Sequence, residues 1–344
     1  MKKHISFLFS LLVFSSSLLT AQTWQRAGKG VNGTPLCFAV YNNELYVGGR
    51  FEGNFAKWDG MRWNNAISNI DGSICTMVEY KGELYAGGYF TAVNGKSFKY
   101  IARWDGKQWQ EVGKGTDSPV LSLLVYNNEL YVAGKFDNAG GAPANHIAKW
   151  DGSKWTAVGK GSDVTIEKIG LSNNVIYASP FFQNDGADFH NIGMWNGTDW
   201  SPVGKWSDGI IFSFASFNNK LFAAGHFTEA SSGVAAGNIA VWDGTKWSSP
   251  SKGMSLHGNT YDANVKTLAV INGTLFAGGQ FDTADGHAAN GLAYWGNVWM
   301  AGNGNIRGTV NAIIEFNGEL FIGGDIANNE NDRPLTIVHM PMKK

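Results

Sequence analysis

Five lysines recur in a short Gly-Lys-Gly-like step, and an ammonium group is a natural partner for a polyanion. They are Lys29, Lys114, Lys160, Lys205 and Lys252. If the step repeats at one radius of a regular scaffold, the lysines form a partial ring that could attract a uronic-acid or sulfated glycan. The same spacing arises when a duplicated turn carries a solvated lysine and no ligand.

Trp206 stands beside Lys205, in the place of the second glycine of that step. It is the one tryptophan outside the repeat described below. An exposed indole there could stack on a sugar ring, or it could cover the gap between two structural units. Both interpretations stay open.

A second group of polar residues begins at residue 167. Glu167 and Lys168 start an apolar segment whose counterparts mostly carry apolar or small residues, and Ser179-Pro180 replaces a Gly-Gly pair. Lys266 adds a positive charge at the start of an equivalent strand, and Asn311 adds a polar amide. Departures from a local rule tend to mark functional or strained positions. Drift in a tolerant repeat produces them too.

Acid–base chemistry needs a residue such as Lys, His or Tyr near the reacting proton. Lys168 and His190 are the candidates, and neither has a clear catalytic partner in the sequence. Asp185 and Asp188 precede His190, but one loop with this spacing is too weak a pattern to predict a metal site. We therefore expect no metal and no cofactor.

A repeat must position these residues. Six pairs of tryptophans are spaced five residues apart, or four in the last pair: Trp58/Trp63, Trp104/Trp109, Trp150/Trp155, Trp195/Trp200, Trp242/Trp247 and Trp295/Trp299. Counted from Trp24, the second members recur every 39 to 52 residues. Such a period indicates stacked supersecondary units that cannot bury their apolar faces singly.

One unit shows the expected strands. The run 120–126 is broken by Asn127-Asn128 and resumes at 130–134, which predicts a hairpin with an Asn-Asn turn. A polar loop follows, and two further strands, 147–150 and 155–158, flank an Asp-Gly turn. Four antiparallel strands make one blade of a β-propeller. The tryptophan pair flanks the last turn and can meet across the two strands.

The units number seven, and the last one supplies only three strands. The chain also begins with an unassigned strand at 24–28. The sequence therefore predicts an all-β fold, a seven-bladed β-propeller of four-stranded antiparallel blades. Residues 22–344 form one domain, and the N-terminal strand joins blade 7 and closes the ring.

The motif Leu-Tyr-Val-Gly-Gly-x-Phe followed by Ile-Ala-x-Trp-Asp-Gly resembles the kelch/galactose-oxidase type of β-propeller, in a branch common in secreted bacterial and fungal surface proteins. The resemblance covers nearly all of residues 22–344 and implies the fold. Galactose oxidase holds copper with two tyrosines and two histidines, and that set does not map onto this chain. Propellers of this kind serve as enzymes, lectins and scaffolds alike.

Composition and the N-terminus limit partners and location. The chain has 27 basic and 28 acidic side chains, a balance that argues against nucleic acid as a partner. Residues 1–21 have the pattern of a secretory signal peptide, with Lys2 and Lys3 before a short apolar run. No segment is long enough to span a membrane. We expect an exported protein that is periplasmic, on the cell surface or extracellular.

Two cysteines follow the expected cleavage point. Cys37 and Cys75 occupy neighbouring rather than equivalent positions of the first two units. We expect two buried small residues, while an oxidising compartment would also permit a disulfide.

We predict a non-catalytic monomer that binds a glycan or a surface protein through the face with the long loops. The expected contacts are Lys29, Lys114, Lys160, Lys205, Trp206, Lys252, Glu167 and Lys266. The alternatives are a carbohydrate-active enzyme such as a polysaccharide lyase, with Lys168 or His190 as base, and an assembly or adhesion scaffold. The sequence alone does not decide among them.

Overall fold

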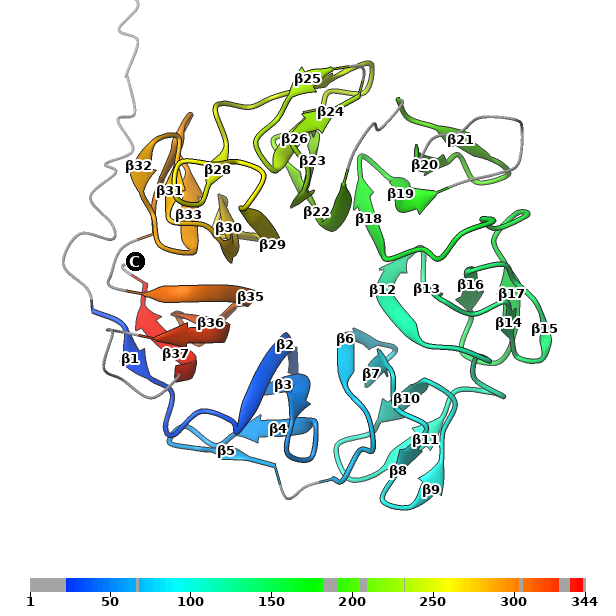
Figure 1. Ribbon diagram of the computed structural model, residues 1–344. Coiled ribbons are helices and arrows are strands. Elements are labelled where there is room, and N and C mark those ends of the chain that lie inside the picture. Colours follow the sequence, from blue (N-terminus) through cyan, green and yellow to red (C-terminus); the bar gives the residue numbers. More distant parts are fainter. Residues whose placement is uncertain are drawn as a thin grey trace, which may run out of the picture.

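The computed structural model describes residues 23–65, 68–181, 191–204, 209–231, 233–302, 306–327 and 335–342. This part of the chain contains strands and no helix, so it holds no helix able to cross a membrane. Its strands form seven four-stranded antiparallel sheets arranged about a common centre (Figure 1). The fold is a β-propeller.

In each sheet the strands follow chain order from the innermost to the outermost, except that the outermost strand of the seventh sheet is β1. They are β2 (Gly33–Tyr41), β3 (Glu44–Phe51), β4 (Phe55–Trp58), β5 (Trp63–Asn64); β6 (Ile74–Tyr80), β7 (Glu83–Gly88), β10 (Ile101–Trp104), β11 (Trp109–Glu111); β12 (Val120–Tyr126), β13 (Glu129–Gly134), β16 (Ile147–Trp150), β17 (Trp155–Ala157); β18 (Lys168–Ser172), β19 (Val175–Phe181), β20 (Asn191–Trp195), β21 (Trp200–Pro202); β22 (Ile210–Phe217), β23 (Lys220–His226), β26 (Ile239–Trp242), β27 (Trp247–Ser248); β29 (Asn264–Ile271), β30 (Thr274–Gln280), β33 (Leu292–Trp295), β34 (Trp299–Ala301); and β35 (Arg307–Phe316), β36 (Glu319–Ala327), β37 (Leu335–Pro341), β1 (Gln25–Arg26).

Short strands extend the loop after the second strand of four sheets. They are β8 (Ala92–Val93) with β9 (Lys96–Ser97), β14 (Asn138–Ala139) with β15 (Ala142–Pro143), β24 (Glu229–Ala230) with β25 (Val234–Ala235), and β31 (Thr283–Ala284) with β32 (His287–Ala288). The last pair is joined by β28 (Met254–Ser255). These loops lie on one face of the molecule, which we call the long-loop face.

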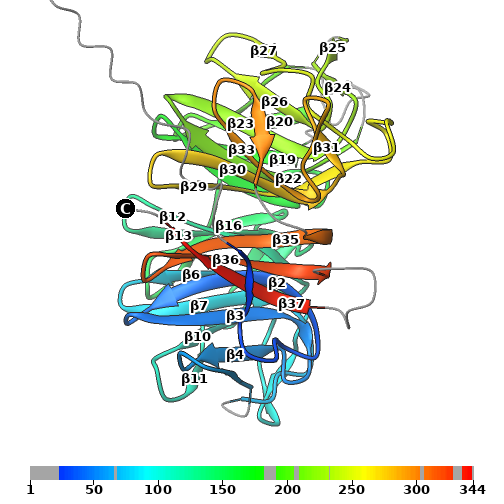
Figure 2. The same cartoon turned by 90° about the vertical axis from the view of Figure 1, so that its left-hand side faces the viewer.

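The seventh sheet combines the two ends of the described chain. β1 pairs antiparallel with β37, with Gln25 opposite His339 and Arg26 opposite Val338. Each first strand contacts the first strand of the next sheet, and β35 contacts β2. Seen from the side, the last sheet lies directly beside β2 and β3 (Figure 2).

The hairpin turns have the predicted geometry. Asn127 and Asn128 have φ values of 50° and 59°, and Asn42 and Asn43 repeat this geometry in the first sheet. Asparagine tolerates the left-handed region that a two-residue hairpin turn needs. The prediction of Asn-Asn hairpins is confirmed.

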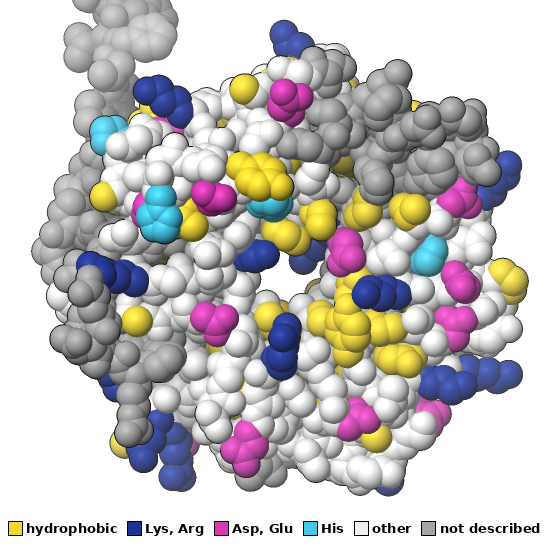
Figure 3. Space-filling model, viewed as in Figure 1, with side chains coloured by type: hydrophobic (Ala, Val, Ile, Leu, Met, Phe, Trp, Pro, Cys, Tyr) yellow, Lys and Arg dark blue, Asp and Glu magenta, His cyan; other side chains and the backbone are white. Residues whose placement is uncertain are grey.

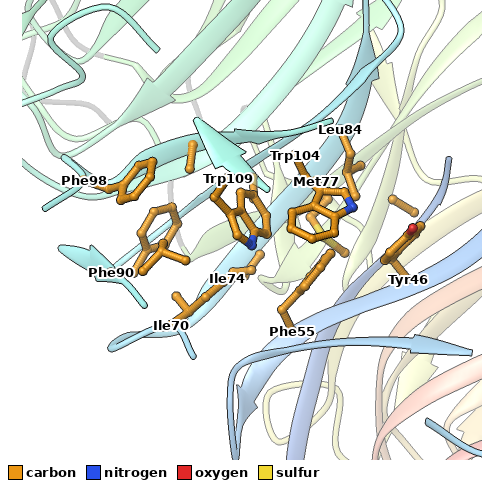
Figure 4. Packing of buried hydrophobic residues seen from close by; sticks show 14 of the residues in the cluster. Tyr46, Phe55, Ile70, Ile74, Met77, Leu84, Phe90, Phe98, Trp104 and Trp109 are labelled. Atoms are coloured by element: carbon orange, nitrogen blue, oxygen red, sulfur yellow. The ribbon is translucent and has the colours of Figure 1, made fainter. Parts of the chain in front are cut away.

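The tryptophan pairs also meet as predicted. Trp104 lies directly opposite Trp109, and their ring centroids are 5.4 Å apart. Both indoles pack against Phe55 of the preceding sheet, as Figure 4 shows. The core is therefore divided among the spaces between adjacent sheets, where each aromatic ring removes apolar surface from water.

The first strand carries a bulge in six of the seven sheets, and a Gly-Gly pair of the second strand faces this bulge in four of them. The register between β6 and β7 shifts between Ile74 and Thr76, so that Cys75 is the extra residue. A Cβ on Gly88 would collide with the carbonyl oxygen of Ser73, which directly precedes the first strand of its own sheet, and one on Gly87 with Val120 of the next sheet. Glycine is required where two backbones approach this closely.

The Asp turns between third and fourth strands give a pH prediction. A hydrogen bond from Thr245, aided by backbone N–H groups, lowers the pKa of Asp243 to about 2. Because the folded-state pKa lies below the unfolded one, the stability gained is present above about pH 4 and is lost as the pH falls towards 2.

We therefore expect urea unfolding of Asp243→Asn to show a smaller loss of stability between pH 4 and 2 than the unchanged protein. The amide keeps the accepting oxygen, as Asn196 does in the fourth sheet, where it accepts from the N–H groups of Thr198 and Asp199 at 2.8 Å. Parallel pH curves for the two proteins would contradict this assignment.

Candidate functional site

The long-loop face is held in shape by hydrogen bonds to two aspartates. Asp117 accepts from the N–H groups of Asp137 and Asn138 at 3.0 Å, and Asp71 accepts from those of Thr91 and Ala92 in the preceding sheet at 2.7 and 2.8 Å. At both aspartates burial opposes ionisation, but the hydrogen bonds outweigh it and lower the pKa. The carboxylates therefore fix the start of the long loops at neutral pH.

Seven residues form an inner tier on the first strands. In six sheets they are the bulge residues, and Glu167 takes the corresponding place in the fourth sheet. All are half-buried, as expected for side chains around a narrow central opening: Leu36, Cys75, Leu121, Glu167, Phe212, Lys266 and Asn311. This inner tier includes the predicted residues Glu167 and Lys266.

A second set, which we call the rim, follows the Gly-Gly position of each second strand. Its members are Arg50, Tyr89, Lys135, Phe181, His226, Gln280 and Asp325. At the six positions other than 181 the residues on either side are buried, whereas Arg50, Lys135, Gln280 and Asp325 are exposed, Tyr89 is 44% exposed and His226 is half-buried. The scaffold therefore repeats, while the residue at the rim position differs from sheet to sheet.

A lysine, a tyrosine and a glutamate come together where the second to fourth sheets border the opening. The Lys135 ammonium is 5.4 Å from the centre of the Tyr89 ring. Hydrogen bonding to Tyr89 raises the pKa of Lys135, and burial raises the pKa of Glu167 while Lys135 opposes that effect. The sequence-predicted Glu167 is thus brought next to a lysine that was not predicted.

A partly apolar side lies at the fifth and sixth sheets. His226 Nε2 is 2.8 Å from the carbonyl oxygen of Tyr261, and the two rings meet edge to face at 5.3 Å. Tyr261 is 63% exposed and Ile210 is 46% exposed. Deeper in, the Lys266 ammonium sits 3.8 Å over the ring of Phe212, a cation–π contact, and burial lowers its pKa.

Lys168 lies one residue further along the inner strand than Glu167. It is half-buried, burial lowers its pKa, and Cys37 and Cys75 are its electrostatic neighbours. Both cysteines are free and half-buried. Burial raises the pKa of both thiols, that of Cys75 to about 11, so both stay protonated at neutral pH. They are poor nucleophiles in this state.

The recurrent lysines lie on the same face at a larger radius. Lys29, Lys114, Lys160 and Lys252 are exposed in turns that follow the outermost strands. Lys160 lies between Gly159 and Gly161, both at positive φ, and its carbonyl accepts from the side chain of Asn145 in the long loop. The turn geometry explains the repeated glycines. The structure does not bring these lysines to the central opening.

Several predicted positions lie outside the described residues. They are Lys205, Trp206, Asp185, Asp188, His190 and the segment 1–21. Within the described ranges, no three His, Cys, Asp or Glu side chains are grouped so that they could hold a metal ion.

Lysine and arginine side chains surround the central opening on the long-loop face (Figure 3). The cationic side chains are Arg50 and Lys135 of the rim, Lys266 of the inner tier, and Lys168. The carboxylates are Asp325 of the rim and Glu167 of the inner tier. Among the described residues, the opening therefore carries four cationic side chains and two carboxylates. The rim was not predicted from the sequence. The pattern that could have revealed it is the variable residue x in the repeated motif Gly-Gly-x-Phe.

Comparisons with known proteins bear on the fold alone. Neither a family model nor a curated protein matches the chain. The crystal structure of the computationally designed Ika8 protein is similar, with a TM-score of 0.54 and 13% identity, over 93% of this chain and 100% of that one. The WD40 β-propeller domain of Doa1 has a TM-score of 0.41 and 10% identity, over 74% and 93% of the two chains. The kelch-type resemblance stays a prediction.

Proposed function

We propose that this protein is an exported, non-catalytic β-propeller that binds an anionic glycan at the central opening of its long-loop face. The observation that carries the proposal is the rim, a position that is exposed in five of the sheets and holds a different side chain in each sheet of a repetitive scaffold. Loops on a rigid framework are where binding is usually built. The excess of cations around the opening favours a polyanion.

The architecture in this proposal is a ring of seven blades closed by the N-terminal strand. Support comes from the seven four-stranded sheets in the described residues, the pairing of β1 with β37, and the contact of β35 with β2. A closed ring holds the rim side chains at fixed separations, which lowers the entropy cost of binding an extended ligand. Export rests on the pattern of residues 1–21.

The test uses polygalacturonate and heparin as anionic probes and dextran as the neutral control. We expect binding of the anionic probes that weakens with rising salt. Replacing Arg50 and Lys135 together with Gln should weaken it at least about tenfold, because two charge-assisted contacts are lost. The matched variant, Lys160→Gln with Lys252→Gln at the outer radius, should change it little.

The outcomes separate the alternatives. Equal losses in both double variants would place the ligand on the outer lysines and not at the opening. An unsaturated product, seen by its ultraviolet absorbance, would identify a polysaccharide lyase. If no probe binds, the protein is better described as a scaffold.

A further inference from the structure

A groove lies between the third and fourth sheets on the face opposite the long loops. It is formed at the β12–β13, β18–β19 and β20–β21 turns and has a volume of about 560 Å³. Pockets that hold small molecules fall in the range of about 300–1,000 Å³. The residues that matter are Tyr126, Asn127, Tyr131, Lys149, Asn174 and Trp195.

One side chain distinguishes this groove from the neighbouring one between the second and third sheets. In the neighbouring groove, Lys81 follows the tyrosine that ends β6, and its Nζ donates to the carbonyl oxygen of Asp151 at 2.6 Å. Asn127 holds the corresponding place after Tyr126 and is too short to span the gap. A Cβ on Gly152 would meet Lys81 Nζ at 3.2 Å, whereas one on Gly197, its counterpart in the fourth sheet, would have no atom within 4 Å.

The inner end of the groove is closed in both cases. Tyr126 donates its hydroxyl to the carbonyl oxygen of Asn174 at 3.0 Å, as Tyr80 does to Asn128 at 2.9 Å. The open space is therefore a bounded recess and not a gap between separated sheets.

Aromatic rings form the walls. The ring centroids of Tyr126 and Tyr131 are 6.4 Å apart, and the two rings are tilted relative to one another. Trp195 is half-buried, and its ring centroid is 5.3 Å from that of Trp200. Such rings offer apolar surface at a small cost in side-chain entropy on binding. A ligand that fits needs an apolar face.

The polar groups of the groove carry no net charge. Lys149 Nζ is 2.9 Å from a carboxylate oxygen of Glu129, which neutralises it. The side-chain amides of Asn127 and Asn174 are exposed and have no hydrogen-bond partner among the described residues. An amide offers both a donor and an acceptor, as a hydroxyl does.

We propose that this groove binds one neutral pyranose unit of a glycan. A sugar ring has an apolar face for the aromatic walls and hydroxyl groups for the two amides, and it needs no countercharge. The site lies on the opposite face from the rim and is independent of the function proposed there. The corresponding groove between the fifth and sixth sheets has about 290 Å³, with Asn218 in the place of Asn127, and should bind the same ligand more weakly.

The experiment follows tryptophan indole N–H signals in ¹⁵N-labelled protein by NMR, with Trp195 assigned through Trp195→Phe. The probes are methyl glucoside, methyl galactoside and methyl mannoside, added to about 50 mM against an expected Kd of about 1 mM for a ligand of this size. We expect at least one probe to shift the Trp195 signal saturably.

Asn127→Lys should weaken that response at least about tenfold, because the lysine can reach the Asn196 carbonyl as Lys81 reaches that of Asp151. The matched control is Asn218→Lys, the same change in the other groove, which should leave the Trp195 response intact. Lys81→Asn should create a similar response at Trp150. Unchanged tryptophan signals elsewhere show that each variant is folded.

Two results would overturn the proposal. One is the absence of any Trp195 shift with all three probes, and the other is a shift that Asn127→Lys leaves unchanged. Arg50→Gln with Lys135→Gln should not alter the response, so this test fails or succeeds separately from the test of the rim.

Discussion

Removing residues 23–30 should lower the free energy of unfolding by at least about 5 kcal/mol. Trp24 is 8% exposed and packs with Val310, Leu320 and Met340, and truncating one such tryptophan costs about 3–5 kcal/mol. The deletion also removes the hydrogen bond from the Ala27 N–H to the Ile337 carbonyl and exposes the edge of β37. Urea unfolding followed by tryptophan fluorescence and circular dichroism measures the loss.

The control for this deletion is Gln25→Ala, because Gln25 is exposed on the same strand. It should change stability by less than about 0.5 kcal/mol. If the deleted protein unfolds at the same urea concentration as the intact one, β1 does not stabilise the seventh sheet and the proposed ring closure is wrong.

Gly88→Ala should cost about 3 kcal/mol or more. The new Cβ would collide with the Ser73 carbonyl oxygen and approach the Ile74 Cα at 3.0 Å. Both are backbone atoms at the start of the first strand, next to its bulge, so relief requires moving the backbone there, and overpacking of a tight site is costly. Chemical denaturation of the variant gives the magnitude.

The matched control is Gly82→Asn in the β6–β7 turn. Gly82 has φ +76° and a Cβ there meets nothing within 4 Å, and the equivalent turns carry Asn43 and Asn128 at positive φ. This variant should keep its stability within about 1 kcal/mol. Equal costs at positions 82 and 88 would mean that the close approach at Gly88 does not account for the loss of stability.

Local features of the fold were predictable because they depend on nearby residues. The Asn-Asn hairpins need only a left-handed turn, and the Trp150/Trp155 pair needs only the four residues between its members. The all-β propeller follows from these units and their period. The number of blades and the closure of the ring remain proposals.

The candidate site was less predictable because it depends on how far each residue lies from the central opening. The sequence predicts both Lys160 and Lys266 as cations of the long-loop face. In the structure Lys160 lies in a turn after an outermost strand and Lys266 in the bulge of an innermost strand, so the width of a sheet separates them. The rim residues Lys135 and Tyr89 were hidden because each stands alone in its own repeat. They become neighbours only when adjacent sheets are packed.

The groove between the third and fourth sheets was invisible for another reason. It is defined by the absence of a long side chain at Asn127 and by the comparison with Lys81 in a different repeat. A missing contact leaves no pattern in a sequence.

One further consequence follows from β1, which pairs with β37 through two residues and is joined to its own sheet by no direct chain connection. At high protein concentration, the same strand can insert beside β37 of another molecule and form identical contacts there. Such strand exchange would yield linked dimers or chains without any new interface. Because exchange requires β1 to detach first, it would be slow. The fraction of linked molecules in a sample would then depend on how long, and at what concentration, the protein had been stored.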